Sequence, residues 1–134
     1  MPENHFYEFG PFRLDVANRI LLRSGEVVPL KKKAYETLLV LVENRGQVLE
    51  KEELMRRLWP DTYVEESNLT HYIYALRRVL GDEKDNPRYI VTIPGRGYRF
   101  VAQVFPVEES TAAGAHEAKA EMRAEPVVAS RWRF

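Results

Sequence analysis

The chain has 134 residues, of which 20 are Lys or Arg and 20 are Asp or Glu, so its formal net charge is zero. This length suits one domain of about 100 residues with an appendage, and an apolar fraction of 45% is enough for one core. The absence of cysteine excludes disulfides, thiolate metal sites and a cysteine nucleophile. Neither an apolar run of roughly 18 residues nor a secretory signal is present, and net neutrality counts mildly against a nucleic-acid binder.

The first expected elements are short antiparallel strands between residues 6 and 28. Phe12, Leu14 and Val16 alternate with polar residues, which is the period of two that a half-buried strand shows. The expected strands are 6–9, 12–16, 19–23 and 26–28, with turns at 10–11, 17–18 and 24–25. This small meander has one apolar face, which another element must cover.

Two helices are expected to follow, over residues 31–45 and 51–59. In the first, Tyr35, Leu38 and Val42 recur on one side at helical spacing, so this helix is the expected cover of the sheet. The residues expected to end the two helices are Gly46 and Pro60.

A brief extended piece is expected between these helices, over residues 47–49. Glu52 and Glu53 then lie in the first turn of the second helix, where negative charge favours the positive end of the helix dipole. A metal-binding or acid–base role for them is not favoured, because no histidine lies within helical reach.

The segment 66–80 is expected to be a helix with two unlike faces. Its apolar positions recur at steps of four, three and four, and they are Leu69, Ile73, Leu76 and Leu80. The other side carries hydrogen-bonding, aromatic and cationic groups, namely Ser67, His71, Tyr74 and Arg78, flanked by Asn68, Thr70 and Arg77. Ser67 or Glu66 is expected to cap its start, and Gly81 to end it. A DNA groove can accept such a face, but an ordinary surface helix has the same pattern.

A hairpin is expected after this helix, with strands over residues 89–93 and 98–101. Pro94 to Gly97 form its turn around one exposed arginine, Arg96. From residue 105 to residue 134 no core-forming pattern remains, and this part is expected to be a linker or a disordered tail. Within it, residues 115–124 are expected to be transiently helical, and the cationic and aromatic end at 131–134 fits either an unstructured terminus or a contact with a membrane interface or a partner.

Four stretches together resemble the OmpR/PhoB-type winged-helix DNA-binding domain, in its CadC/ToxR-like branch. They are Leu30–Leu39, Glu53–Trp59, Asn68–Arg78 and Tyr89–Phe100. The specific signal is Leu-Arg-Arg at 76–78 followed by Gly-x-Gly-Tyr-Arg-Phe at 95–100. The resemblance covers residues 6–104. It implies an α+β winged helix-turn-helix domain over residues 1–104, with an N-terminal four-stranded antiparallel sheet, three helices and a C-terminal β-hairpin wing.

The resemblance also implies a function and a set of site residues. A bacterial transcription regulator of this type binds double-stranded promoter DNA by sequence, with helix 66–80 in the major groove and wing 94–97 at the minor groove. The implied base contacts are Ser67, Asn68, His71, Tyr74 and Ala75. The implied phosphate contacts are Thr70, Tyr72, Arg77, Arg78, Trp59 and Arg99. The implied wing contact with the minor groove is Arg96, and the implied RNA polymerase contact is the loop at Asp61, Thr62 and Tyr63.

Two of these assignments have a structural alternative. Trp59 also suits core packing, and Arg99 also suits a pair with an acid in the domain. The chain departs from the family at Lys31-Lys32, where Thr-Pro is usual, and at Glu50, where Ser or Thr is usual. No arginine stands at 67, 74 or 75, so guanine contacts known in relatives are not carried over.

The implied partners are promoter DNA, including direct repeats bound by tandem copies or weak homodimers, and RNA polymerase. No cofactor, metal or small-molecule substrate is implied. The expected location is the cytoplasm, either free or as the cytoplasmic domain of a longer membrane-anchored regulator. No receiver domain precedes residue 6, so phospho-acceptor control within this chain is not expected.

Two other functions compete with DNA binding as interpretations of this sequence. A winged helix that binds protein stays open, because a fold does not determine function and the net charge is zero. Catalysis is not expected, because the three histidines at 5, 71 and 116 lie far apart and no phosphate-cradling loop follows a strand.

Overall fold

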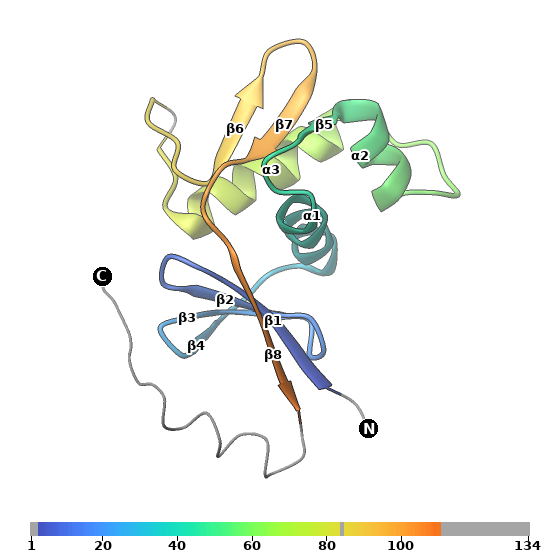
Figure 1. Cartoon of the computed structure of the whole chain (residues 1–134). Helices are drawn as coiled ribbons and strands as arrows, with labels where there is room; N and C mark the ends of the chain where they lie inside the picture. The colour runs from blue at the N-terminus through green and yellow to red at the C-terminus, as the bar shows by residue number, and fades with distance from the viewer. Residues whose placement is uncertain (1–2, 84, 111–134) are drawn as a thin grey trace.

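The computed structural model describes residues 3–83 and 85–110 (Figure 1). Its N-terminal elements are the strands β1 (Glu3–Phe9), β2 (Phe12–Asp15), β3 (Ile20–Arg23) and β4 (Glu26–Val28). Its middle elements are α1 (Lys32–Glu43), β5 (Val48–Glu50), α2 (Lys51–Leu58) and α3 (Glu66–Leu80). Its last elements are β6 (Ile90–Ile93), β7 (Gly97–Phe100) and β8 (Phe105–Ser110). The predicted α+β winged-helix layout, with three helices, antiparallel sheets and a C-terminal hairpin, is confirmed.

Two antiparallel sheets enclose the helices. The larger has the strand order β4-β3-β2-β1-β8, and the smaller has the order β5-β7-β6. Figure 1 shows α1 crossing between the larger sheet and the β6–β7 hairpin, which stands at the far side of the molecule from β1–β4. The hairpin is the wing, and β5 attaches it to the start of α2.

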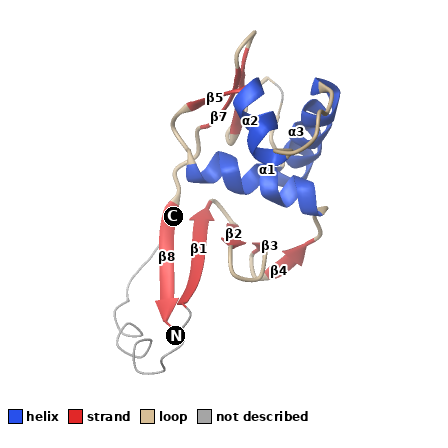
Figure 2. Cartoon of the chain, turned by 90° about the vertical axis from the view of Figure 1, so that its right-hand side faces the viewer, coloured by secondary structure: helices blue, strands red, loops and turns tan. Residues whose placement is uncertain are grey.

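The prediction of a linker or disordered tail from residue 105 is wrong for Phe105–Ser110. This segment is β8, and it pairs antiparallel with β1 from Glu8↔Phe105 to Glu3↔Ser110. The N-terminal sheet therefore has five strands where four were expected. Figure 2 shows β8 running beside β1. A short polar segment that contains a proline shows little strand pattern of its own, and its pairing depends on an edge about 100 residues upstream. The rest of the expected tail, residues 111–134, lies outside the described residues.

An aromatic cluster joins the five-stranded sheet to the wing. The ring centroids of Phe9 and Phe100 are 5.2 Å apart, and those of Phe12 and Tyr89 are 5.8 Å apart, both edge to face. All four side chains are buried, so the sheets share one core with the helices. Beneath α1, the Tyr35 hydroxyl donates to the Asp15 carbonyl at 3.1 Å, and burial raises the pKa of Tyr35 to about 12.

The helix ends differ in part from expectation. Lys33 Nζ donates to the Leu58 carbonyl at 2.7 Å, so α1 closes the C-terminal end of α2. The prediction that Ser67 or Glu66 caps α3 is wrong. Both residues already lie inside the helix, whose N-cap residue is Glu65, and the Glu65 side chain makes no cap hydrogen bond. Gly81 ends α3 in the left-handed conformation (φ 76°), as expected.

Candidate nucleic-acid interface

Helix α3 buries one side and exposes the other. The four residues of its predicted apolar stripe, Leu69, Ile73, Leu76 and Leu80, are each at most 3% exposed, as their spacing predicts. They join the core that α1 also builds. The helix is therefore held by one face over its whole length, and the other face is a rigid outward surface.

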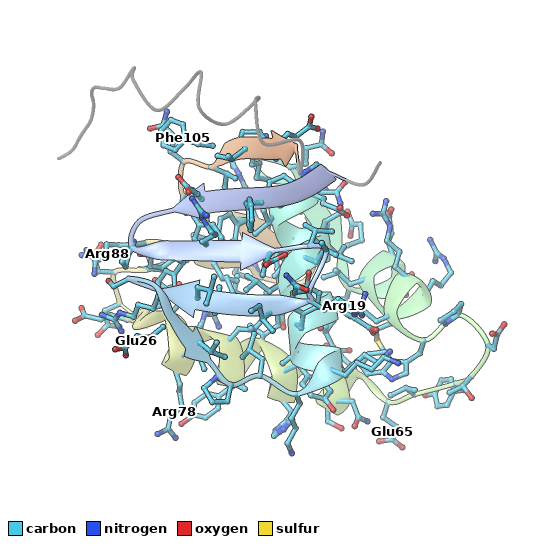
Figure 3. All side chains as sticks on the ribbon, turned by 90° about the horizontal axis from the view of Figure 1, so that it is seen from below. Arg19, Glu26, Glu65, Arg78, Arg88 and Phe105 are labelled. Atoms are coloured by element: carbon cyan, nitrogen blue, oxygen red, sulfur yellow. The ribbon has the colours of Figure 1, made fainter. Side chains whose placement is uncertain are left out.

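The exposed face carries most of the predicted base-contacting residues. Ser67, Asn68, His71 and Tyr74 are exposed, and Ala75 is half-buried at the margin. Tyr74 is 60% exposed, and the Arg78 guanidinium lies 5.9 Å from the centre of its ring. Figure 3 shows Arg78 and Glu65, near the two ends of α3, both projecting outward at one edge of the molecule. The structure thus brings these side chains onto one surface.

Arg77 lies in a different place from the other cations of α3. Its Nη2 atom donates to the Ile90 carbonyl at 3.2 Å and to Thr92 Oγ1 at 2.6 Å, both in β6. Its Nε atom is buried and has no hydrogen-bond partner among the described residues. Arg77 therefore ties the recognition-helix candidate to the wing, and its predicted phosphate contact stays a prediction.

Asp82 is a second tie that sequence reasoning missed. Its carboxylate accepts the backbone N–H groups of Arg88, Tyr89 and Ile90 at 2.5 to 3.2 Å. An Asp directly after the glycine that ends a helix was the available signal, because such a carboxylate readily accepts nearby backbone donors. Together, Asp82 and Arg77 set the position of the wing relative to α3.

The wing tip is held against the start of α2. The Lys51 backbone N–H donates to the Arg96 carbonyl at 2.9 Å. The Arg96 guanidinium donates from Nε and Nη2 to Glu50 Oε2, at 3.2 and 2.9 Å. Arg96, the predicted minor-groove residue, is thus ion-paired in the isolated chain, and its partner Glu50 was not among the predicted site residues.

The other predicted contact residues lie around this centre. Thr70 is exposed, and its hydroxyl donates to the Glu66 carbonyl at 3.4 Å. Tyr72 and Trp59 are half-buried with ring centroids 6.2 Å apart, so both pack against the core as well as reaching the surface. Arg99 is exposed on β7 and makes no ion pair within residues 3–83 and 85–110.

The loop between α2 and α3 lies beside a hollow of about 340 Å³. The hollow is lined by Glu52, Met55, Arg56, Trp59, Thr62, Tyr63 and Val64. Tyr63 is 89% exposed, the largest exposed fraction among the exposed large apolar side chains. The predicted polymerase-contact residues Asp61, Thr62 and Tyr63 are all exposed.

The described residues lack the features of two other kinds of site. Within residues 3–83 and 85–110, no three His, Cys, Asp or Glu side chains come together as a metal site would need. Over the same ranges, every helix is too short or too polar to cross a membrane.

Comparison with known proteins places this architecture among transcription regulators. Residues 25–100 match the family model described as "Transcriptional regulatory protein, C terminal". The chain is 41% identical over 97 residues to the transcriptional regulator HilA of Salmonella typhimurium, which covers 72% of this chain and 17% of HilA. The chain therefore spans about a sixth of the length of that relative.

Solved structures agree with this match. The DNA-binding domain of Klebsiella pneumoniae RstA, in complex with the RstA box, superposes with a TM-score of 0.64 at 30% identity, over 72% of this chain and 96% of that one. The DNA-binding domain of Escherichia coli CadC superposes with a TM-score of 0.67 at 26% identity, over 78% and 98%.

Proposed function

The chain belongs to the OmpR/PhoB-type family of transcriptional regulatory protein C-terminal domains, and we propose on this premise that it binds double-stranded DNA by sequence. The observation that carries the proposal is the joint placement of α3 and the wing. Arg77 and Asp82 connect the two elements, and α3 turns an exposed polar face away from the core. The RstA domain, of the same fold, is solved with its DNA box.

In this proposal the exposed face of α3 lies in the major groove. Asn68 and His71 offer hydrogen bonds to base edges, the Tyr74 ring and the Ala75 methyl offer apolar contact with thymine, and Ser67 adds a hydroxyl. The phosphate contacts are assigned to Thr70, Tyr72, Arg78, Trp59 and Arg99, and to Arg77, whose guanidinium also donates hydrogen bonds to β6. Arg96 at the wing tip is assigned to the minor groove, where a narrow groove attracts arginine.

Selection of bound sites from random duplex DNA is the direct test, because it measures binding and specificity together. We expect one enriched site, with Asn68→Ala or His71→Ala each relaxing it at particular base pairs. Each change should cost about 1–3 kcal/mol on the selected site, a loss of roughly 5- to 150-fold.

Arg78→Ala is the matched comparison, since Arg78 lies on the same helix but is assigned to phosphate. It should weaken selected and unselected DNA alike and reduce the salt dependence by about one unit of slope. Wild-type protein that enriches no site would contradict the proposal. It would favour the alternative, a winged helix that binds protein, which the zero net charge keeps open.

We further propose that the α2–α3 loop contacts RNA polymerase, which the exposure of Tyr63 and the apolar hollow beside it support. Tyr63→Ala should leave DNA affinity unchanged, because the loop lies outside the assigned contacts, and should lower transcription from a reporter promoter several-fold. Unchanged transcription at equal promoter occupancy would contradict this role. Thr62→Ala, a smaller change at another predicted contact residue of the same loop, should lower transcription less than Tyr63→Ala.

Three finer assignments also stay proposals. Tandem or weakly dimeric binding would appear as two shifted complexes on a duplex with two direct repeats of the selected site. A cytoplasmic location follows from the proposed ligand. Attachment to a membrane as part of a longer regulator is tested by fractionating cells that express the natural reading frame.

A further inference from the structure

The wing arginine and an acid at the start of α2 form a contact that bears on DNA affinity. The carboxylate of Glu50 accepts hydrogen bonds from both Nε and Nη2 of Arg96. The Glu50 side chain is 50% exposed and the Arg96 side chain is 58% exposed. We propose that Glu50 restrains DNA binding by competing with DNA for Arg96. The proposal rests on the proposed function, because it concerns the affinity of that same interface.

The backbone brings the two side chains together. Glu50, the last residue of β5, is the strand partner of Gly97 in β7, directly after Arg96. The Lys51 N–H bond to the Arg96 carbonyl holds the same junction at 2.9 Å. The pairing is therefore built into the register of the small sheet and does not depend on a chance meeting of two long side chains.

The Glu50 carboxylate does not cap the helix that it precedes. Glu50 occupies the N-cap position of α2, yet its side chain makes no cap hydrogen bond. The resemblance leads one to expect Ser or Thr at this position, and those residues cap helices well. Glu50 therefore makes no capping hydrogen bond, and its carboxylate neutralises the charge of Arg96 at the tip of the wing.

A second ion pair of the same kind lies next to it. Lys51 Nζ pairs with Glu66 Oε2 at 3.1 Å, in the first turn of α3. Two adjacent residues therefore hold two neighbouring elements by ion pairs. Glu50 pairs with Arg96 at the wing tip, and Lys51 pairs with Glu66 at the start of α3, so that the charges cancel within each pair. DNA phosphates approaching this side meet paired charges, and DNA competes with Glu50 for the Nε–H and Nη2–H donors of Arg96.

The energetic consequence has a defined sign. In the free protein the pair stabilises Arg96 in its present position, and a DNA complex that uses Arg96 loses that stabilisation. Removing the carboxylate should therefore tighten DNA binding. For an exposed ion pair of this type, the DNA affinity should rise about 2- to 5-fold at low ionic strength. The gain should be smaller at high salt, because salt screens exposed ion pairs.

The test is a double-mutant cycle on the selected DNA site with Glu50→Gln, Arg96→Gln and the combined variant. We expect Glu50→Gln to bind about 2- to 5-fold more tightly than wild type, and to have no effect in the Arg96→Gln background. Glu52→Gln is the matched control. It removes the same charge from the first turn of the same helix, and Glu52 has no ion-pair partner among the described residues. Equal gains from Glu52→Gln, or a gain that survives in the Arg96→Gln background, would overturn the proposal.

A measurement without DNA separates this inference from the proposed function. The Arg96 Nε–H resonance in the free protein should shift in Glu50→Gln and stay in place in Glu52→Gln, and thermal unfolding should confirm that both variants fold. An unchanged resonance, or unchanged DNA affinity of Glu50→Gln, overturns the inference while DNA binding stands. Absence of any DNA binding by wild type overturns the proposed function, and the inference with it.

Discussion

Gly97→Ala is expected to lower the free energy of unfolding by about 3 kcal/mol, the upper part of the range for overpacked sites. A Cβ atom built at Gly97 lies 1.9 Å from the Leu49 carbonyl oxygen and 2.9 Å from its carbon. Both are backbone atoms of β5, so no side chain can move aside. Relief requires β5 and β7 to separate, which also dislodges Arg96 and the start of α2.

Chemical denaturation measures this loss, and DNA titration at a temperature where the variant stays folded measures its effect on the wing. Gly95→Ala is the matched control in the same turn. A Cβ atom at Gly95 meets no atom within 4 Å. Because φ is 73° there, Gly95→Ala should lower the free energy of unfolding by only about 1 kcal/mol. A Gly97→Ala protein as stable as Gly95→Ala would contradict the steric argument.

Asp82→Ala is expected to lower the free energy of unfolding by about 3 kcal/mol, because three backbone N–H donors lose a charged acceptor together. Hydrogen bonds to charged groups contribute about 1.5–3 kcal/mol each, and the partial exposure of this loop reduces their sum. The Ile90 N–H, at 2.8 Å from Oδ2, begins β6 and is the donor closest to the core. The loss should appear both in unfolding and in faster amide exchange at residues 88–90.

Asp85→Ala is the control. Asp85 is exposed, and its carboxylate accepts no hydrogen bond from residues 3–83 and 85–110. Asp82→Asn keeps one acceptor oxygen without the charge, and should fall between wild type and Asp82→Ala. Slow exchange at residues 88–90 in Asp82→Ala would show that the carboxylate does not hold the loop.

These two sites and the Glu50–Arg96 pair hold opposite ends of the wing. Gly97 sets the register of β7 on β5, Asp82 fixes the strand β6, and Glu50 meets Arg96 at the tip. The wing is thus placed by contacts with two other segments, which are β5 with its last residue Glu50 and the turn after α3 that contains Asp82. Its proposed role at the minor groove depends on both.

Much of the interface was predictable from local pattern. The spacing of Leu69, Ile73, Leu76 and Leu80 predicted which face of α3 is buried, and all four are buried. Glycines and a proline predicted the hairpin, and Gly81 predicted the end of α3. These features succeed because helix period and turn chemistry are properties of adjacent residues.

Prediction failed where a residue's partner lies far along the chain. Residues 105–110 were expected to be a tail, but they form a strand because β1 offers a free edge. The hydrogen bonds from Arg77 Nη2 to β6 were likewise not foreseen, while the phosphate contact predicted for Arg77 stays a prediction. Glu50 carried no signal beyond its departure from Ser or Thr, since its pairing with Arg96 spans 46 residues.

The sequence by itself therefore determined the family, the order of the elements from β1 to β7 and the face that α3 presents. Only the tertiary structure decided which of the charged groups on that side are already occupied. Periodicity reports which side of an element is buried, whereas an ion pair or a strand edge depends on two segments whose distance only folding defines. For this protein that difference separates Arg78, stacked on Tyr74 at the surface, from Arg77, held by the wing, and from Arg96, held by Glu50.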